Sequence, residues 1–205
     1  MASQSKRARG RPRADDADAK IARILSEAAK LFAMQGFNKT SFASVATAVG
    51  MTLPGLTHYF PSKIGLLLAV LEDRDAEMFS QNPDRDPHKI FETLAQLMAR
   101  DLTVGAQMTQ LFRMLSAEAQ SDTHPAHAWF KLRNEKILSS LSTDLSSLQR
   151  QGIIRSDVDC QDEAISILAM MEGLQLWWTR MPDTCRAKSI FDVFLEQTKQ
   201  RLLVP

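Results

Sequence analysis

With 205 residues and a hydrophobic fraction of 44%, the chain can form a core without disulfides or structural metals. Its two cysteines, Cys160 and Cys185, are too few for a disulfide framework and lack the spacing of a zinc site, which excludes small cross-linked secreted domains. Residues 1–63 hold 10 basic and 4 acidic residues (+6) whereas residues 64–205 hold 15 and 20 (−5), as expected of a chain that meets a polyanion at one end. The chain starts polar and basic, and its longest apolar run, residues 66–71, is too short to cross a bilayer. We therefore expect a soluble cytoplasmic protein without a membrane partner.

Residues 1–14 are polar and basic, which predicts a disordered arm. Within it, Arg9-Gly10-Arg11-Pro12-Arg13 resembles an AT-hook core, in which an extended segment lies in a narrow minor groove. This resemblance makes Arg9 and Arg11 candidate DNA contacts. The alternative is a tail that only adds nonspecific attraction to phosphates.

Three helices follow the arm. Apolar residues at helical spacing predict the first over residues 15–35, and Gly36 can adopt the left-handed conformation that ends it. Ser41 and Thr52 are suited to cap two short helices over residues 42–48 and 53–59. Gly50 permits the sharp turn between them, so the pair fits a DNA-binding helix-turn-helix. A fourth helix is predicted over residues 63–79.

The helix-turn-helix and its flanks resemble the TetR family of transcriptional regulators over roughly residues 18–71. The resemblance is carried by Gly-Phe after the first helix, by residues 40–52, and by Leu56-Thr57-His58-Tyr59-Phe60-Pro61-Ser62-Lys63 before Leu66-Leu67. It implies an all-α fold with an N-terminal three-helix DNA-binding domain. A fourth helix would link this domain to a C-terminal helical bundle that dimerises and often encloses a small-molecule pocket.

The predicted DNA contacts surround the second short helix. The resemblance assigns Tyr59 and Lys63 to phosphates, and a threonine at position 57, where the family usually has tyrosine, reaches less far. Hydroxyls and imidazoles can bond base edges, apolar side chains can meet thymine methyls, and a lysine at a helix start favours a phosphate. For His58 and Tyr59 the alternative is packing over a small core, and Phe60 is expected to be core. The complete set is Arg9, Arg11, Ser41, Thr52, Leu53, Pro54, Gly55, Thr57, His58, Tyr59 and Lys63.

The C-terminal part begins after a proline-rich break over residues 80–87. We predict a basic arm over residues 1–14, a DNA-binding domain over 15–80, and a ligand-binding and dimerisation domain over 81–205. Helices are expected over residues 88–104, 106–121, 125–151, 161–181 and 184–203. The helix over residues 161–181 is apolar nearly all round, so it must be buried on every face, either across a homodimer or inside a monomer core.

Methionines beside aromatic residues could line an apolar cavity in this domain, although such residues are more often plain core. The candidates are Phe91, Met98, Phe112, Leu115, Trp129, Met171 and Trp178. His124 and His127 lie three residues apart but lack a third ligand nearby, so capping and packing are favoured over metal binding. No cofactor or metal is expected.

The sequence contains no GxSxG, P-loop, GxGxxG or HExxH motif, so we do not expect an enzyme. The function predicted is a sequence-specific DNA-binding regulator. It would be a repressor released from a palindromic operator on double-stranded DNA by a small apolar ligand. The alternatives are an architectural DNA-binding protein and a helical adaptor without an effector.

Overall fold

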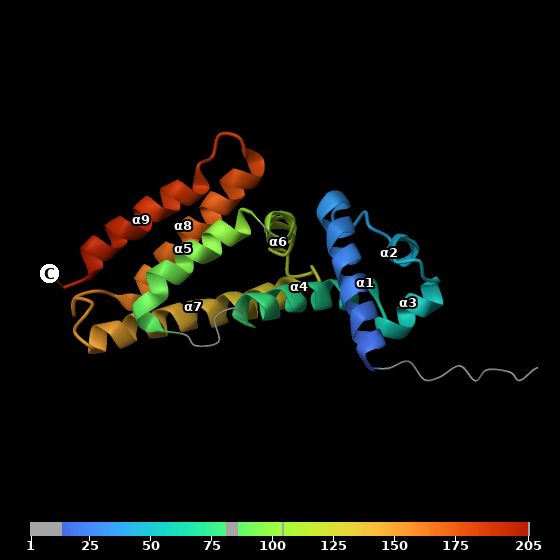
Figure 1. The fold of residues 1–205 in the computed structure, drawn as a ribbon, viewed down its shortest axis with the longest axis horizontal. Helices are drawn as coiled ribbons and strands as arrows, with labels where there is room; N and C mark the ends of the chain where they lie inside the picture. The colour runs from blue at the N-terminus through green and yellow to red at the C-terminus, as the bar shows by residue number, and fades with distance from the viewer. Residues whose placement is uncertain (1–13, 81–85, 104, 205) are drawn as a thin grey trace, which may run out of the picture.

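The structure is a computed structural model that describes residues 14–80, 86–103 and 105–204, and within these ranges it confirms the all-α prediction (Figure 1). The only β-type pairing there is an isolated bridge between Ile154 and Leu203. Residues 1–13, with the predicted contacts Arg9 and Arg11, lie outside the described ranges. The elements are α1 Ala14–Gln35, α2 Phe42–Ala48, α3 Leu53–Tyr59, α4 Lys63–Ser80, the 3₁₀ turn η1 Pro87–Lys89, α5 Ile90–Asp101, α6 Ala106–Glu118, α7 His127–Arg150, α8 Cys160–Arg180 and α9 Ala187–Leu202.

The helix-turn-helix has the predicted bounds because its end signals are local. Gly36 and Gly50 have φ angles of +81° and +66°, which residues with a Cβ rarely adopt. Ser41 caps α2 by accepting a hydrogen bond from the Ser44 N–H at 2.9 Å, and Thr52 caps α3 by accepting one from the Gly55 N–H at 3.2 Å. Each helix of the motif therefore begins at a side chain that satisfies its free backbone donors.

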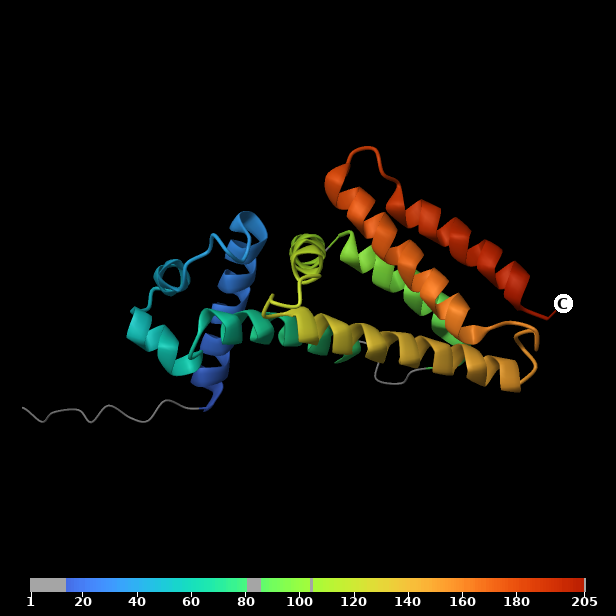
Figure 2. The same cartoon turned by 180° about the vertical axis from the view of Figure 1, so that it is seen from behind.

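The first hydrophobic core joins the helix-turn-helix to two helices from beyond residue 80. Its fully buried members from the N-terminal part include Phe32, Val45 and Leu56. Helix α6 packs against α1 and adds Phe112 to this core. Figures 1 and 2 show α6 between α1 and α5 from opposite sides. Helices from both sides of residue 80 therefore share this core.

The second core lies among α5, α7, α8 and α9, at the end of the molecule away from α2 and α3 (Figure 1). Some helices here are shorter than predicted because tight turns replace their ends. Helix α5 begins only at Ile90, after a 3₁₀ turn capped by Asp86. Successive turns through His124 delay the start of α7, and a turn in which Cys185 N donates to Met181 O delays that of α9.

Helix α8 is not buried on every face within one chain, which corrects the monomer-core interpretation of its sequence. Ala164 and Ile167 are fully buried, whereas Met170 is exposed and Trp177 is 59% exposed. The polar Gln175 is among the buried residues.

The described residues form no helix long and apolar enough to cross a membrane.

Candidate DNA interface and ligand cavity

Helix α3 presents one face to solvent and anchors the other through Leu56, which is fully buried. Ser41 is exposed at the start of α2, while Gly55 and Tyr59 are half-buried. The exposed residues at the start of α3 and along it are Thr52, Leu53, Pro54, Thr57 and His58. Most of the predicted base-contacting residues therefore share one accessible surface.

The two threonines on this surface differ in what they can offer a base. The Thr57 hydroxyl donates to the Leu53 carbonyl at 2.8 Å, so its oxygen can accept a further hydrogen bond but its proton is already used. The Thr52 hydroxyl accepts from Gly55 N and keeps its own proton as a donor. His58 packs edge-on against the Tyr59 ring at 5.5 Å, so Tyr59 supports the histidine from the half-buried side.

Lys63, predicted as a phosphate contact, binds backbone carbonyl groups within the protein. Its ammonium donates to the carbonyl oxygens of Phe37 and Thr40, both at 3.0 Å. It also lies 4.3 Å from the centre of the Phe37 ring. The side chain therefore fastens the start of α4 to the loop between α1 and α2, and the recognition helix itself contains no lysine or arginine.

Replacing Lys63 by methionine is expected to destabilise the protein by about 2 kcal/mol, because two half-buried carbonyls lose a charged donor. Urea unfolding followed by circular dichroism measures this loss. The matched control is Lys39→Met, at an exposed lysine of the same loop. Unchanged stability together with a uniform loss of DNA affinity would restore the phosphate role.

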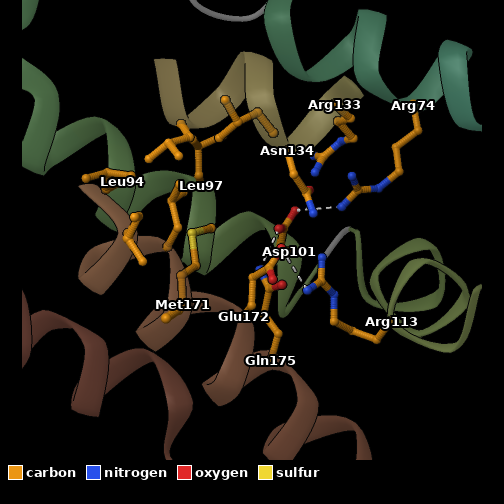
Figure 3. A pocket seen from close by; sticks show the side chains of 15 residues that line it. Arg74, Leu94, Leu97, Asp101, Arg113, Arg133, Asn134, Met171, Glu172 and Gln175 are labelled. Atoms are coloured by element: carbon orange, nitrogen blue, oxygen red, sulfur yellow. Dashed lines mark hydrogen bonds and ion pairs between the residues drawn. The ribbon is translucent and has the colours of Figure 1, made fainter. Parts of the chain in front are cut away.

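A cavity of about 320 Å³ lies among α5, α7 and α8, with α4 and α6 at its charged end (Figure 3). Its volume is at the lower end of the range for small-molecule sites. The apolar lining residues are Leu94, Leu97, Ile137, Leu138, Ile165, Leu168, Ala169 and Met171. The polar lining residues are Arg74, Asp101, Arg113, Arg133, Asn134, Glu172 and Gln175.

Ion pairs connect the charged end to the helix that leads from α3. On α4, Asp75 accepts from Arg133 Nε at 2.8 and 3.0 Å, and Arg74 Nη2 lies 3.7 Å from Asp101 Oδ1. The other Asp101 oxygen accepts from Gln175 Nε2 at 2.8 Å. Helix α4 is therefore held to α5 and α7 by charged contacts beside the cavity.

One aromatic ring lies beneath three guanidinium groups at this end. The Phe112 ring centre is 4.3 Å from Arg74, 4.4 Å from Arg133 and 5.1 Å from Arg113. The negative face of a benzene ring partly offsets the cost of burying such cations. Burial nevertheless lowers the pKa of Arg74 to about 10, although Asp101 opposes the shift, so the group stays charged near neutral pH.

Of the seven predicted ligand contacts, only Met171 lines this cavity. Phe112 and Leu115 are buried in the first core, and Phe91 and Met98 in the second. Trp129 lines a shallow hollow beside Asp75, and Trp178 lines another beside Cys185. Helical periodicity identifies inward-facing residues, but it does not separate those packed on neighbours from those facing a space.

The charged residues of the cavity were not predicted, although the sequence carries a signal for Arg74. It follows the buried Val70 and Leu71 by one helical turn, so it continues the inward face of α4. A charged residue on a buried face needs partners, which makes it a candidate functional group.

The two histidines take part in capping and packing, the roles favoured from the sequence. His124 Nδ1 accepts from the Ala126 N–H, and its ring meets Phe37 edge-on at 5.9 Å. His127 Nδ1 lies 2.9 Å from the Ala119 carbonyl oxygen. Among the residues with described positions, no group of three or more potential ligands is arranged to hold a metal ion.

Comparison with known proteins gives the same assignment as the fold and the motif. Residues 24–70 match the model for bacterial regulatory proteins of the tetR family. The HTH-type transcriptional repressor ComR of Escherichia coli is 32% identical over 142 residues, 69% of this chain, and the match spans 60% of ComR. The HTH-type transcriptional regulator TtgR of Pseudomonas putida is 21% identical over 179 residues, 83% of this chain and 85% of TtgR.

Solved structures share the whole arrangement of helices. The SmeT–triclosan complex has a TM-score of 0.80 at 17% identity, covering 91% of this chain and 92% of SmeT. A transcriptional regulator from Saccharomonospora viridis in complex with choline has a TM-score of 0.74 at 18% identity, covering 92% and 100%. On the family match, the relatives and the fold together, the chain belongs to the TetR family of bacterial transcriptional regulators.

Proposed function

We propose that the protein is a homodimeric repressor that binds a palindromic DNA site through α3 and leaves it when a small molecule fills the cavity. The observation that carries the proposal is the course of α4. This helix begins at Lys63, just after α3 ends, and brings Arg74 to the cavity wall. A single helix therefore belongs to both the DNA-binding surface and the candidate ligand site.

An unpartnered apolar face supports the dimer. Met170, Gly173 and Trp177 follow one another at helical spacing on α8, and Met181 comes directly after the helix; the two methionines and Trp177 expose large apolar side chains. At Gly173 a Cβ would meet nothing within 4 Å, so this position leaves room for another helix. Exposed Ile190 and Val193 extend the apolar surface onto α9. Two copies could bury these surfaces as a four-helix interface around a twofold axis.

Release of DNA follows from ligand-dependent placement of α4. The Arg74–Asp101 and Asp75–Arg133 pairs hold α4 in the observed position. A ligand that binds more tightly when these pairs are rearranged shifts the population toward that arrangement. Since both α3 helices of a dimer must match successive major grooves, a small displacement of α4 lowers the affinity for a two-half-site operator.

The similar structures support a small organic effector, because SmeT is in complex with triclosan and the Saccharomonospora viridis regulator is in complex with choline. The eight apolar side chains of the present cavity suit an apolar ligand body. Its charged and polar side chains favour an effector that also carries a polar or charged group to pair with them.

The test is binding to an inverted repeat from the DNA upstream of the chain's own gene, against a scrambled duplex at the same salt concentration. A repressor is expected to prefer the repeat by at least about a thousandfold and to footprint both half-sites. Thr57→Ala with His58→Ala should remove that preference while nonspecific binding remains. Equal affinity for both duplexes would favour an architectural protein, and no binding to either would favour an adaptor.

Deleting residues 1–13 is expected to lower DNA affinity and to flatten its salt dependence, because this segment carries Arg9, Arg11 and three further basic residues. The slope of log K against log salt should fall by about one for each phosphate that the arm no longer neutralises. A duplex series from 50 to 200 mM salt, roughly the range over which phosphate-dominated binding weakens most visibly, measures it. An unchanged slope would show that the arm takes no part in binding.

A further inference from the structure

The charged end of the cavity holds buried arginine donors that the protein itself does not satisfy. Arg74 Nη1 has no hydrogen-bond partner among the described residues, and its nearest carboxylate oxygen, on Asp75, is 3.9 Å away. Arg113 Nε also lacks a partner there. The side chains of Arg74 and Arg113 are 8% and 10% exposed. Buried donors of this kind are costly unless an acceptor reaches their side chains.

The carboxylates near Arg74 and Arg113 hold these two arginines only loosely or at an exposed position. Asp75, just outside the lining, pairs with Arg133, which leaves Asp101 and Glu172 as the carboxylates nearest Arg74 and Arg113. Asp101 already accepts from Gln175 and approaches Arg74 only to 3.7 Å. The other carboxylate, Glu172, is 46% exposed, and its Oε1 lies 3.1 Å from Arg113 Nη1. Of these two carboxylates, only Glu172 is exposed enough to leave its arginine for solvent when another anion takes its place.

We infer that the cavity takes an amphipathic monoanion, a carboxylate or similar oxyanion on a single apolar body. The anion binds the guanidiniums of Arg113 and Arg74, and the body lies along Leu94, Leu138 and Leu168. This inference rests on the proposed function, because it names the class of effector for the same cavity. Figure 3 shows the two arginines approaching the charged end from different helices, with the labelled leucines on the other side.

The anion would act by exchange of partners. A ligand carboxylate replaces Glu172 on Arg113 and supplies the acceptor that Arg74 lacks. The ligand carboxylate then competes with Asp101 for Arg74. Because Arg74 belongs to α4, a change of its partner alters the position of the helix that leads to α3. A cationic ligand of the same shape meets repulsion from the same two arginines, and a neutral alcohol offers them only an uncharged acceptor, which binds more weakly.

The test compares three probes with the same eight-carbon chain: octanoate, 1-octanol and octyltrimethylammonium. Calorimetric titration of the full-length protein is expected to show octanoate binding at least about tenfold more tightly than octanol, with the cation weakest. Octanoate should also release the protein from operator DNA at a lower concentration than octanol or the cation does. If octanol or the cation binds as tightly as octanoate, the anion inference is overturned and the cavity remains a ligand site.

Two variants at the mouth of the cavity shift the preference in opposite directions. Arg113→Met should remove most of the advantage of octanoate and leave octanol unchanged, and the folded state is retained because the freed Glu172 reaches solvent. Glu172→Gln removes the internal competitor and should tighten octanoate binding several-fold. An octanoate advantage that is the same in both variants overturns the role of Arg113. Binding of none of the probes overturns the cavity as the effector site, whereas DNA recognition is tested separately by the inverted repeat.

Discussion

Replacing Trp177 by glutamate is expected to convert the protein from a dimer into monomers and to abolish specific operator binding. Trp177 is 59% exposed at the centre of the apolar face of α8, so the single chain does not need it for its own core. In a twofold interface each substitution is made twice, and each removes a large apolar side chain and introduces a charge. A loss of about 2 kcal/mol for each copy raises the dissociation constant of the dimer by about a thousandfold.

Sedimentation equilibrium at micromolar concentration measures the change, and far-ultraviolet circular dichroism checks that the helices persist. The matched control is Met34→Glu, which also places a charge at a highly exposed apolar residue, but on α1. This control should remain dimeric. A Trp177→Glu protein that stays dimeric and still footprints both half-sites would show that the subunits pair through another surface.

The helix-turn-helix was predictable because its determinants lie within a few residues of one another. The bounds of α2 and α3 depend on Ser41, Thr52 and Gly50, whose capping bonds and positive φ involve only near neighbours. The same locality explains the correct end of α1 before Gly36. The exposure of α3 also follows, because Leu56 alone points from the middle of that helix into the core.

The hydrogen-bond partners of Lys63 could not be predicted from its position at the start of a helix. Its partners are the carbonyls of Phe37 and Thr40, more than 20 residues earlier in the chain. Their approach depends on how α4 crosses α1, which no local pattern specifies. A lysine at a helix start is equally suited to a phosphate and to an internal carbonyl.

The cavity was predicted in kind but not in composition. Apolar periodicity placed Phe112 and Met98 correctly in the interior, and the structure packs both against other side chains. What makes the space distinctive is the meeting of Arg74, Arg113 and Arg133 from three helices. Contacts between residues so distant in the sequence depend on tertiary packing, as does the docking of α6 on α1.

The largest loss of stability is expected from Phe112→Ala. The Phe112 side chain is 1% exposed, packs in the first core and lies under three guanidinium groups. Its truncation leaves a cavity and removes the ring that faces these cations. Together these effects should cost about 3–5 kcal/mol in urea or thermal unfolding. Because α6 packs against α1, the N-terminal and C-terminal helices should still unfold in one transition, at a lower urea concentration or temperature.

The contribution of the ring face is isolated by Phe112→Leu, which keeps most of the volume. The matched control is Phe130→Leu, since Phe130 is also buried, has its ring centre 4.9 Å from that of Phe112 and belongs to the same core. If the cation–π contacts stabilise the arginines, Phe112→Leu should lose about 1–2 kcal/mol more than Phe130→Leu. Equal losses would mean that ion pairs and solvent alone stabilise the three cations. The ring would then contribute only apolar packing to the core between the DNA-binding helices and the ligand cavity.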